Sequence, residues 1–190
     1  MADDENVVRW FAPDPRAIIE LDAFTTSRSL RTLVRRGVFD IVVNRSFEEV
    51  IAACADRPDG TWISGEVRSA YVRLHELGFA HSVEAWHEGK LAGGLYGVAI
   101  GAEFFGESMF HRATDASKVA FVGLVGRLRE RGFRLLDVQF VTDHLRRFGA
   151  VEIPRSDYLR RLRRAVQVPC AFDDRVGPTA VTVREQDKDA

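Results

Sequence analysis

The stretch from residue 93 to residue 110 constrains the fold most, because it combines closely spaced glycines with aromatic side chains and the carboxylate of Glu107. Glycine in a strand loses much backbone entropy and offers no side chain to pack, so it commonly marks a bulge, a bend or a close approach of a ligand. Glu107 lies among apolar residues, where an unpaired carboxylate is costly. The pattern predicts two adjacent strands that form either the floor of a binding cleft or a twisted hairpin of the core.

The composition is that of a globular chain of 190 residues, with 46% hydrophobic and 29% charged residues. A net charge of −1 predicts no overall attraction to nucleic acid, so any basic surface must be local. Cys54 and Cys170 are too few for a disulfide framework. The acidic first residues lack the features of a signal peptide, and no apolar run has the length of a membrane span. We therefore expect a cytoplasmic location without a membrane partner.

Hydrophobic periodicity and turn residues predict an α+β fold. Strands are expected at residues 17–21, 39–44, 80–87 and 135–140, with two more joined by a tight turn near residue 101. Helices are expected at residues 27–36, 46–55, 64–78, 115–132, 142–148 and 155–166, the last one capped by Ser156. Three antiparallel strands, a long helix and a further strand are the order of an acetyltransferase-like (GNAT-type) core of mixed, largely antiparallel sheet.

A loop at residues 56–60 marks a possible boundary between two parts of the chain. We expect residues 1–60 to form a truncated N-terminal α/β subdomain and residues 61–168 to form the catalytic domain. Residues 169–190 are expected to form a frayed C-terminal tail.

Asp137 and Gln139 lie in the strand expected after the long helix, where the period of two places both side chains on one face. Polar groups inside an apolar strand need partners. They either orient a nucleophile and relay a proton, or satisfy backbone groups of a loop, and the residues alone leave both possibilities open. Glu107 on a nearby strand favours the catalytic role, because three polar groups then converge at one end of the sheet.

Motifs for metal or nucleophilic chemistry are incomplete. His75 begins a zinc-protease pattern, but Phe79 stands where the second histidine belongs. Ser108 begins a nucleophile elbow, but Phe110 replaces its last glycine. The chain has no glycine-rich turn that would hold the phosphates of a nucleotide cofactor. The sequence therefore predicts no metal and no cofactor.

The last expected helix is rich in arginine, as is the helix expected at residues 27–36. Such helices are either solvated faces or surfaces that bind nucleic-acid phosphates without reading sequence. In the last helix the basic residues are Arg155, Arg160, Arg161, Arg163 and Arg164.

The chain resembles the leucyl/phenylalanyl-tRNA–protein transferase family in the order and spacing of a series of short motifs that run from Trp10 to Leu162. The motifs are Trp-Phe-Ala-Pro-Asp-Pro-Arg at 10–16, Thr-Trp-Ile at 61–63, Leu-His-Glu-Leu-Gly at 74–78, Ala-His-Ser-Val-Glu-Ala-Trp at 80–86, Gly-Gly-Leu-Tyr-Gly-Val at 93–98, Phe-Gly-Glu-Ser-Met-Phe at 105–110, Ala-Ser-Lys at 116–118, Asp-Val-Gln at 137–139, and residues 144–150.

The resemblance implies a bacterial cytoplasmic enzyme that moves leucine or phenylalanine, and less readily methionine, from a charged tRNA. The acceptor would be the N-terminal Arg or Lys of a protein, and the product an N-degron handed to ClpS–ClpAP. An ester is exchanged for an amide, so the reaction runs downhill without ATP, metal or cofactor. The enzyme has to position two substrates, accept a proton and stabilise an oxyanion.

The resemblance also assigns roles to residues. Asp137 and Gln139 would bind and activate the acceptor's α-amino group, and Glu107 would pair with its cationic side chain or hold the hydrogen-bond network. The arginines of the last helix would contact tRNA phosphates. The aminoacyl side chain would enter an apolar pocket made of Trp62, Leu95, Phe104, Met109, Phe121, Leu124 and Leu128.

Family members normally carry several dozen residues before the first motif, including a Gly-Ile-Phe-Pro-Trp-like segment that helps to hold the terminal adenosine of the tRNA. Here that motif begins at Trp10, so we expect other residues to hold the adenosine or the affinity for tRNA to be lower. Two alternatives stay open: a weakly active homologue that binds peptide or tRNA without efficient turnover, and an acyltransferase that uses another activated donor.

Overall fold

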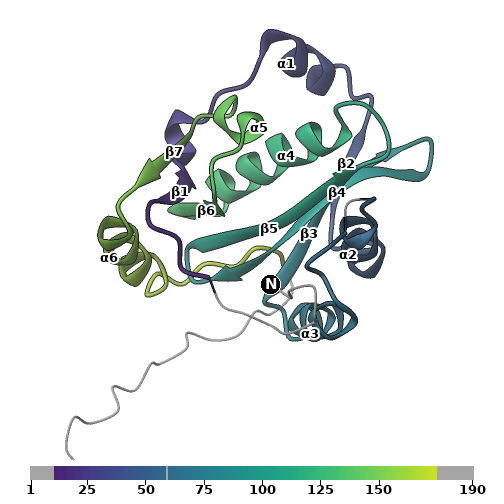
Figure 1. The fold of residues 1–190 in the computed structure, drawn as a ribbon. Helices are drawn as coiled ribbons and strands as arrows, with labels where there is room; N and C mark the ends of the chain where they lie inside the picture. Colours follow the sequence, from purple (N-terminus) through teal and green to yellow (C-terminus); the bar gives the residue numbers. More distant parts are fainter. Residues whose placement is uncertain (1–10, 59, 175–190) are drawn as a thin grey trace, which may run out of the picture.

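The computed structural model describes residues 11–58 and 60–174 (Figure 1). Within these ranges, seven strands form one mixed sheet in the order β2-β3-β4-β5-β6-β1-β7. β5 and β6 are parallel, and the other neighbouring strands are antiparallel. The strands are β1 (Arg16–Ile19), β2 (Asp40–Val43), β3 (Ala80–His87), β4 (Lys90–Ile100), β5 (Glu103–His111), β6 (Leu135–Gln139) and β7 (Ala150–Ile153). The expected mixed α+β class is confirmed.

Helices cover both faces of the sheet. α4 lies along one face, and α2 and α3 lie on the other (Figure 1). Phe121, Leu124 and Leu128 recur along α4 at helical spacing and are buried against the strands. The helical elements are η1 (Leu21–Ala23), α1 (Arg28–Arg35), α2 (Phe47–Ala55), α3 (Gly65–Glu76), α4 (Ala116–Glu130), α5 (Asp143–Arg146) and α6 (Arg155–Ala165).

Serine side chains begin two of the helices. The Oγ of Ser27 accepts a hydrogen bond from the amide of Leu30, and the Oγ of Ser64 accepts one from the amide of Val67. The prediction that Ser156 caps the last helix is wrong, because Pro154 occupies the cap position of α6. The carbonyl of Pro154 accepts the first hydrogen bonds of the helix, and Ser156 lies inside the first turn.

Within the first sixty residues, the described ones contribute two strands, β1 and β2, to the common sheet. β1 lies between β6 and β7, and β2 forms the opposite edge beside β3. Ala17, Ile18 and Ile19 of β1 are buried because the strand is covered on both faces. A boundary at residue 60 stays a prediction about which part of the chain folds independently.

The segment after α6 packs into the core. Phe172 is only 2% exposed, and its ring stacks on His81 and Phe104 at centroid distances of 4.5 and 5.2 Å. Beside it, the Nδ2 of Asn44 donates to Asp173 at 2.5 Å. The prediction of a frayed tail is therefore wrong for residues 169–174, and residues 175–190 lie outside the described part.

The glycines of β4 make room for protein rather than for a ligand. A Cβ on Gly93 would lie 2.7 Å from the Cβ of Ala116 at the start of α4. A Cβ on Gly97 would clash with the ring of Phe104. These glycines therefore allow close packing of the core, whereas Leu95 and Tyr96 between them border a cavity. No helix in the described ranges has the length and apolar character needed to span a membrane.

Candidate active site

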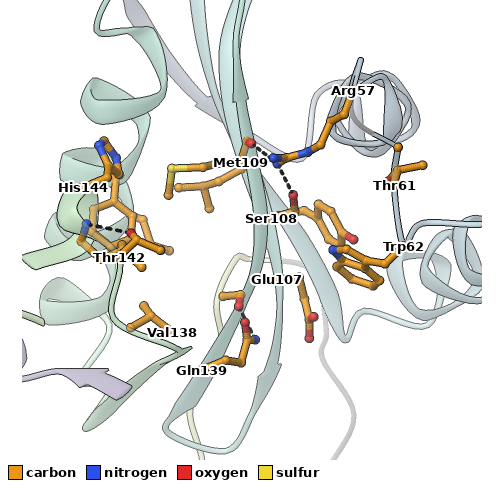
Figure 2. Close-up of a pocket in the computed structure, with 17 residues that line it drawn as sticks. Arg57, Thr61, Trp62, Glu107, Ser108, Met109, Val138, Gln139, Thr142 and His144 are labelled. Atoms are coloured by element: carbon orange, nitrogen blue, oxygen red, sulfur yellow. Dashed lines mark hydrogen bonds between the residues drawn. The ribbon is translucent and has the colours of Figure 1, made fainter. Parts of the chain in front are cut away.

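A cavity opens where β5 and β6 separate. The two strands are paired only through residues 103–105 and 135–137. Beyond this point Gly106 and Gln139 lie on opposite sides of an opening, which leads into a cavity of about 750 Å³. Figure 2 shows Thr61 and Trp62 at one side of this cavity, Thr142 and His144 at the other, and Ser108 and Met109 of β5 between them. The splitting of the sheet therefore creates the site.

One wall of the cavity is apolar. Of the seven residues expected in an apolar pocket, five border the cavity: Trp62, Leu95, Met109, Phe121 and Leu124. Phe104 and Leu128 do not border it, and both pack inside the core. Phe104 fills the space above Gly97, and Leu128 lies one helical turn beyond Leu124. The apolar wall consists of Leu95, Met109, Phe121, Leu124, Val138 and Leu145, whereas Trp62 lies on the other side of β5 (Figure 2).

Asp137 is fully buried behind the cavity, and its carboxylate is held by Arg16, by Tyr158 and by the backbone amide of Gln139. The Nε of Arg16 donates to both carboxylate oxygens, at 3.0 and 3.1 Å, and its Nη2 donates to Oδ2 at 2.5 Å. The hydroxyl of Tyr158 donates to Oδ2 at 2.7 Å. Burial together with the charge of Asp137 raises the pKa of Tyr158, so the hydroxyl stays a donor. These charge-assisted hydrogen bonds fix the carboxylate of Asp137 in position.

Gln139 borders the cavity and is anchored at two points. Its backbone amide donates to Oδ1 of Asp137 at 2.8 Å, and its Nε2 donates to the carbonyl of Gly106 at 2.6 Å across the opening. Its φ of 60° lies in the left-handed region, which a residue other than glycine occupies only when its surroundings impose it. No hydrogen bond among the described residues uses its carboxamide oxygen, which is therefore available to a bound molecule.

Glu107 lies at an irregularity of the ladder between β4 and β5. Tyr96 is opposite Ser108 and Gly97 is opposite Gly106, so Glu107 is the extra residue of a bulge. Because of the bulge, the carboxylate of Glu107 lines the cavity, a position that regular strand pairing would not give it. Burial raises the pKa of Glu107 to about 7, although a hydrogen bond from Tyr71 acts in the opposite direction. Glu107 therefore changes its charge near neutral pH.

A family model described as leucyl/phenylalanyl-tRNA protein transferase matches residues 18–163. The chain belongs to this family. A leucyl/phenylalanyl-tRNA–protein transferase of Gloeobacter violaceus is 54% identical over 165 residues, which are 87% of this chain and 85% of that protein. One of Rubrobacter xylanophilus is 54% identical over 173 residues, which are 90% of each chain.

A more distant likeness extends to solved structures. A conserved protein of unknown function from Staphylococcus epidermidis is 17% identical, with a TM-score of 0.50 over 74% of this chain and 57% of that one. This likeness concerns the fold alone.

Glu103 is another buried carboxyl group near Asp137. It is fully buried, and neither of its oxygens has a hydrogen-bond partner among the described residues. Burial, followed by the charge of Asp137, raises the pKa of Glu103 to about 9. Glu103 is therefore protonated at neutral pH and lies outside the cavity lining, so it supplies no charge to the site.

The arginines of α6 differ in their surroundings. Arg160 forms an ion pair with Asp157 at 2.7 Å, and Arg161 forms one with Glu20. The backbone amide of Arg155 donates to Asp14, and its guanidinium donates to the carbonyl of Ala12 at 3.1 Å. Arg163 and Arg164 are exposed, and neither forms an ion pair within the described residues. These last two are the arginines of α6 that are most available to an external anion. Among residues 11–58 and 60–174, no three His, Cys, Asp or Glu side chains gather as metal ligands would.

Replacing Glu107 with glutamine is expected to flatten the pH dependence of stability between pH 5 and pH 8. The unfolded carboxyl releases its proton near 4.5 and the folded one near 7. Between these values the folded state binds more protons, so the free energy of unfolding falls as pH rises. We expect the wild type to lose on the order of 1–2 kcal/mol more than Glu107→Gln over this range. Urea denaturation at both pH values measures the difference, and parallel curves would contradict the assignment.

Proposed function

We propose that this protein transfers leucine or phenylalanine from an aminoacyl-tRNA to the N-terminus of a protein. The observation that carries the proposal is a cavity lined by apolar side chains together with Gln139 and Glu107, in a chain of this family. Such a site suits a reaction between an apolar aminoacyl ester and a polar amine. Because both substrates meet in one cavity, proximity supplies much of the rate enhancement.

The apolar wall suits the aminoacyl side chain. Leu95, Met109, Phe121 and Leu124 present only carbon and sulfur to the cavity. A pocket of this kind rejects charged side chains but distinguishes apolar ones by only about 1–3 kcal/mol per methylene. Leucine and phenylalanine are therefore both accepted, and methionine less readily.

The carboxamide oxygen of Gln139 suits the attacking α-amino group. An α-amino group has a pKa of about 7.7–8.0, so a useful fraction is neutral at physiological pH. A carboxamide is a poor base, so Gln139 orients the amine by accepting one of its N–H groups. Asp137 does not border the cavity; it holds the backbone of Gln139 and adds negative charge nearby. Gln139 is thus the residue in contact with the acceptor, and Asp137 a positioning residue.

Glu107, when ionised, suits the side chain of an N-terminal Arg or Lys. It is a carboxylate in the cavity that forms no ion pair with an arginine or lysine among the described residues. The product would carry a new N-terminal leucine or phenylalanine, the type of N-degron delivered to ClpS–ClpAP. We further propose a cytoplasmic location, where charged tRNA is found, and an acetyltransferase-like (GNAT-type) core. The element order β3, β4, β5, α4, β6 supports such a core, as does the position of the cavity where the parallel strands β5 and β6 separate.

The direct test is transfer of labelled phenylalanine from Phe-tRNA to a peptide that begins with arginine, with a peptide that begins with glutamate as the control acceptor. Transfer to the first peptide only is the expected result. Binding of tRNA or peptide without transfer would instead indicate a weakly active homologue. Reaction with coenzyme A thioesters but not with Phe-tRNA would indicate an acyltransferase with another donor.

Replacing Arg163 and Arg164 with glutamine is expected to weaken tRNA binding and to flatten its salt dependence. Removing one arginine that binds a phosphate reduces the slope of log K against log salt concentration by about 1. Filter binding over a range of salt concentrations measures the slope. Lys90→Gln, at the start of β4, is the control for a simple change in net charge. An unchanged slope in the arginine variants would remove this face of α6 from the tRNA interface.

A further inference from the structure

A second recess, of about 360 Å³, adjoins the cavity of the proposed active site. Arg57, Met109 and His144 border both spaces, so the two lie side by side. The recess also contains His111, at the end of β5, and Lys118, in the first turn of α4. Basic side chains from four separate parts of the fold therefore converge beside the site.

The recess carries an excess of positive charge. Its one carboxylate among the described lining residues is that of Asp115, which accepts from the Nζ of Lys118 at 2.6 Å. Arg57 has no carboxylate partner in the described ranges. It is held instead by the carbonyl of Cys54 at 3.1 Å, the carbonyl of Met109 at 3.0 Å and the Oγ of Ser108 at 3.1 Å. A guanidinium fixed by neutral groups keeps its charge available to an anion.

Two further features favour an anion in this recess. The Nε2 of His144 is buried and has no hydrogen-bond partner among the described residues, which is costly unless a bound group supplies one. Burial, and then the charges of Lys118, Arg147 and His111, lower the pKa of His144, as expected where positive charge accumulates. In addition, the 15-residue helix α4 begins at Ala116, so its positive end points to the recess through Ser117.

The geometry of the donor indicates which anion belongs here. In an aminoacyl-tRNA the ester is carried by the ribose of the terminal nucleotide, and the 5′ phosphate is attached to the same ribose. With the aminoacyl group against the apolar wall, this phosphate would lie one sugar away, at the distance of a space that adjoins the cavity. We propose, on the basis of the function proposed above, that the recess lined by Arg57, His111, Lys118 and His144 binds the 5′ phosphate of the terminal nucleotide of the aminoacyl-tRNA.

The test compares two stable donor analogues that differ by one phosphate. Both carry phenylalanine linked by an amide to the 3′ position of 3′-amino-3′-deoxyadenosine, and one also has a 5′ phosphate. The wild type is expected to bind the phosphorylated analogue at least about tenfold more tightly, the effect of one hydrogen bond to a charged group. Isothermal titration calorimetry gives both dissociation constants.

Lys118→Met and His111→Asn are expected to reduce this gain to about twofold or less and to leave the affinity for the phosphate-free analogue within about twofold of wild type. His111→Asn leaves the ion pair of Lys118 with Asp115 in place, so it tests the recess without freeing a carboxylate. Lys90→Met is the matched control for the loss of a lysine and is expected to keep the full gain.

Equal affinity of the wild type for the two analogues would overturn this inference and leave the proposed function standing. A full phosphate gain in both recess variants would also overturn it. Binding of neither analogue by the wild type would overturn the proposed function, and this inference with it.

Discussion

Replacing Asp137 with alanine is expected to lower the free energy of unfolding by about 3–5 kcal/mol and to abolish aminoacyl transfer. The substitution leaves the guanidinium of Arg16, whose side chain is only 14% exposed, without its carboxylate partner. It also removes the acceptor for the hydroxyl of Tyr158 and for the backbone amide of Gln139. Urea denaturation measures the stability, and transfer from Phe-tRNA to an arginine peptide measures the activity.

A double-mutant cycle with Arg16→Ala tests the buried pair directly. Arg16→Ala is expected to cost as much as Asp137→Ala, because it leaves the carboxylate of Asp137 buried and unpaired. The double variant Arg16→Ala/Asp137→Ala is expected to be less destabilised than the sum of the two single variants. Additive losses, or a stability of Asp137→Ala within about 0.5 kcal/mol of wild type, would contradict the network described here.

The central part of the fold could be predicted because its signals are local. The turn at His87–Lys90 and the apolar spacing along α4 predict the hairpin and the long helix. β7 was not predicted, because its four residues follow a short helix without a clear alternation. Its pairing with β1, more than a hundred residues earlier in the chain, decides its conformation.

The site was predictable only in part. The residue types of the apolar pocket followed from the family resemblance, but the depth of the cavity along α4 did not. Helical spacing places Leu124 and Leu128 on one face and cannot tell which of them borders a cavity. The structure decides this, because only Leu124 lies where β5 and β6 have separated.

The partners of Asp137 were not predicted at all. Arg16 is 121 residues and Tyr158 is 21 residues away in the sequence, and β1 and α6 bring them together. Arg16 ends the Trp-Phe-Ala-Pro-Asp-Pro-Arg motif, which is the only sequence signal that could have drawn attention to it. Period-two spacing placed Asp137 and Gln139 on one face, whereas Gln139 has a left-handed backbone and borders the cavity while Asp137 does not. The bulge at Glu107 is likewise a departure from regular strand pairing that the residue pattern does not predict.

Replacing Gln139 with alanine is expected to reduce kcat/KM for the peptide acceptor by about 100-fold or more, the effect typical of losing a group that orients reactants or stabilises charge in the transition state. The substitution removes the carboxamide of a residue that lines the cavity, and with it the hydrogen bond to the carbonyl of Gly106. The loss of stability is expected to stay near 1 kcal/mol, because one hydrogen bond of a partly exposed side chain is lost. Affinity for Phe-tRNA is expected to be unchanged, since the apolar wall is intact.

Two further substitutions separate the carboxamide of Gln139 from its backbone conformation. Gln139→Asn suits the left-handed φ, because asparagine is enriched there, but its shorter side chain cannot reach Gly106. Gln139→Glu keeps the reach and loses the N–H donor to that carbonyl. Both variants are expected to be as inactive as Gln139→Ala, because activity requires the carboxamide to be anchored across the opening with its oxygen toward the amine. Wild-type turnover in Gln139→Asn would show that the backbone at this position matters and the anchored carboxamide does not.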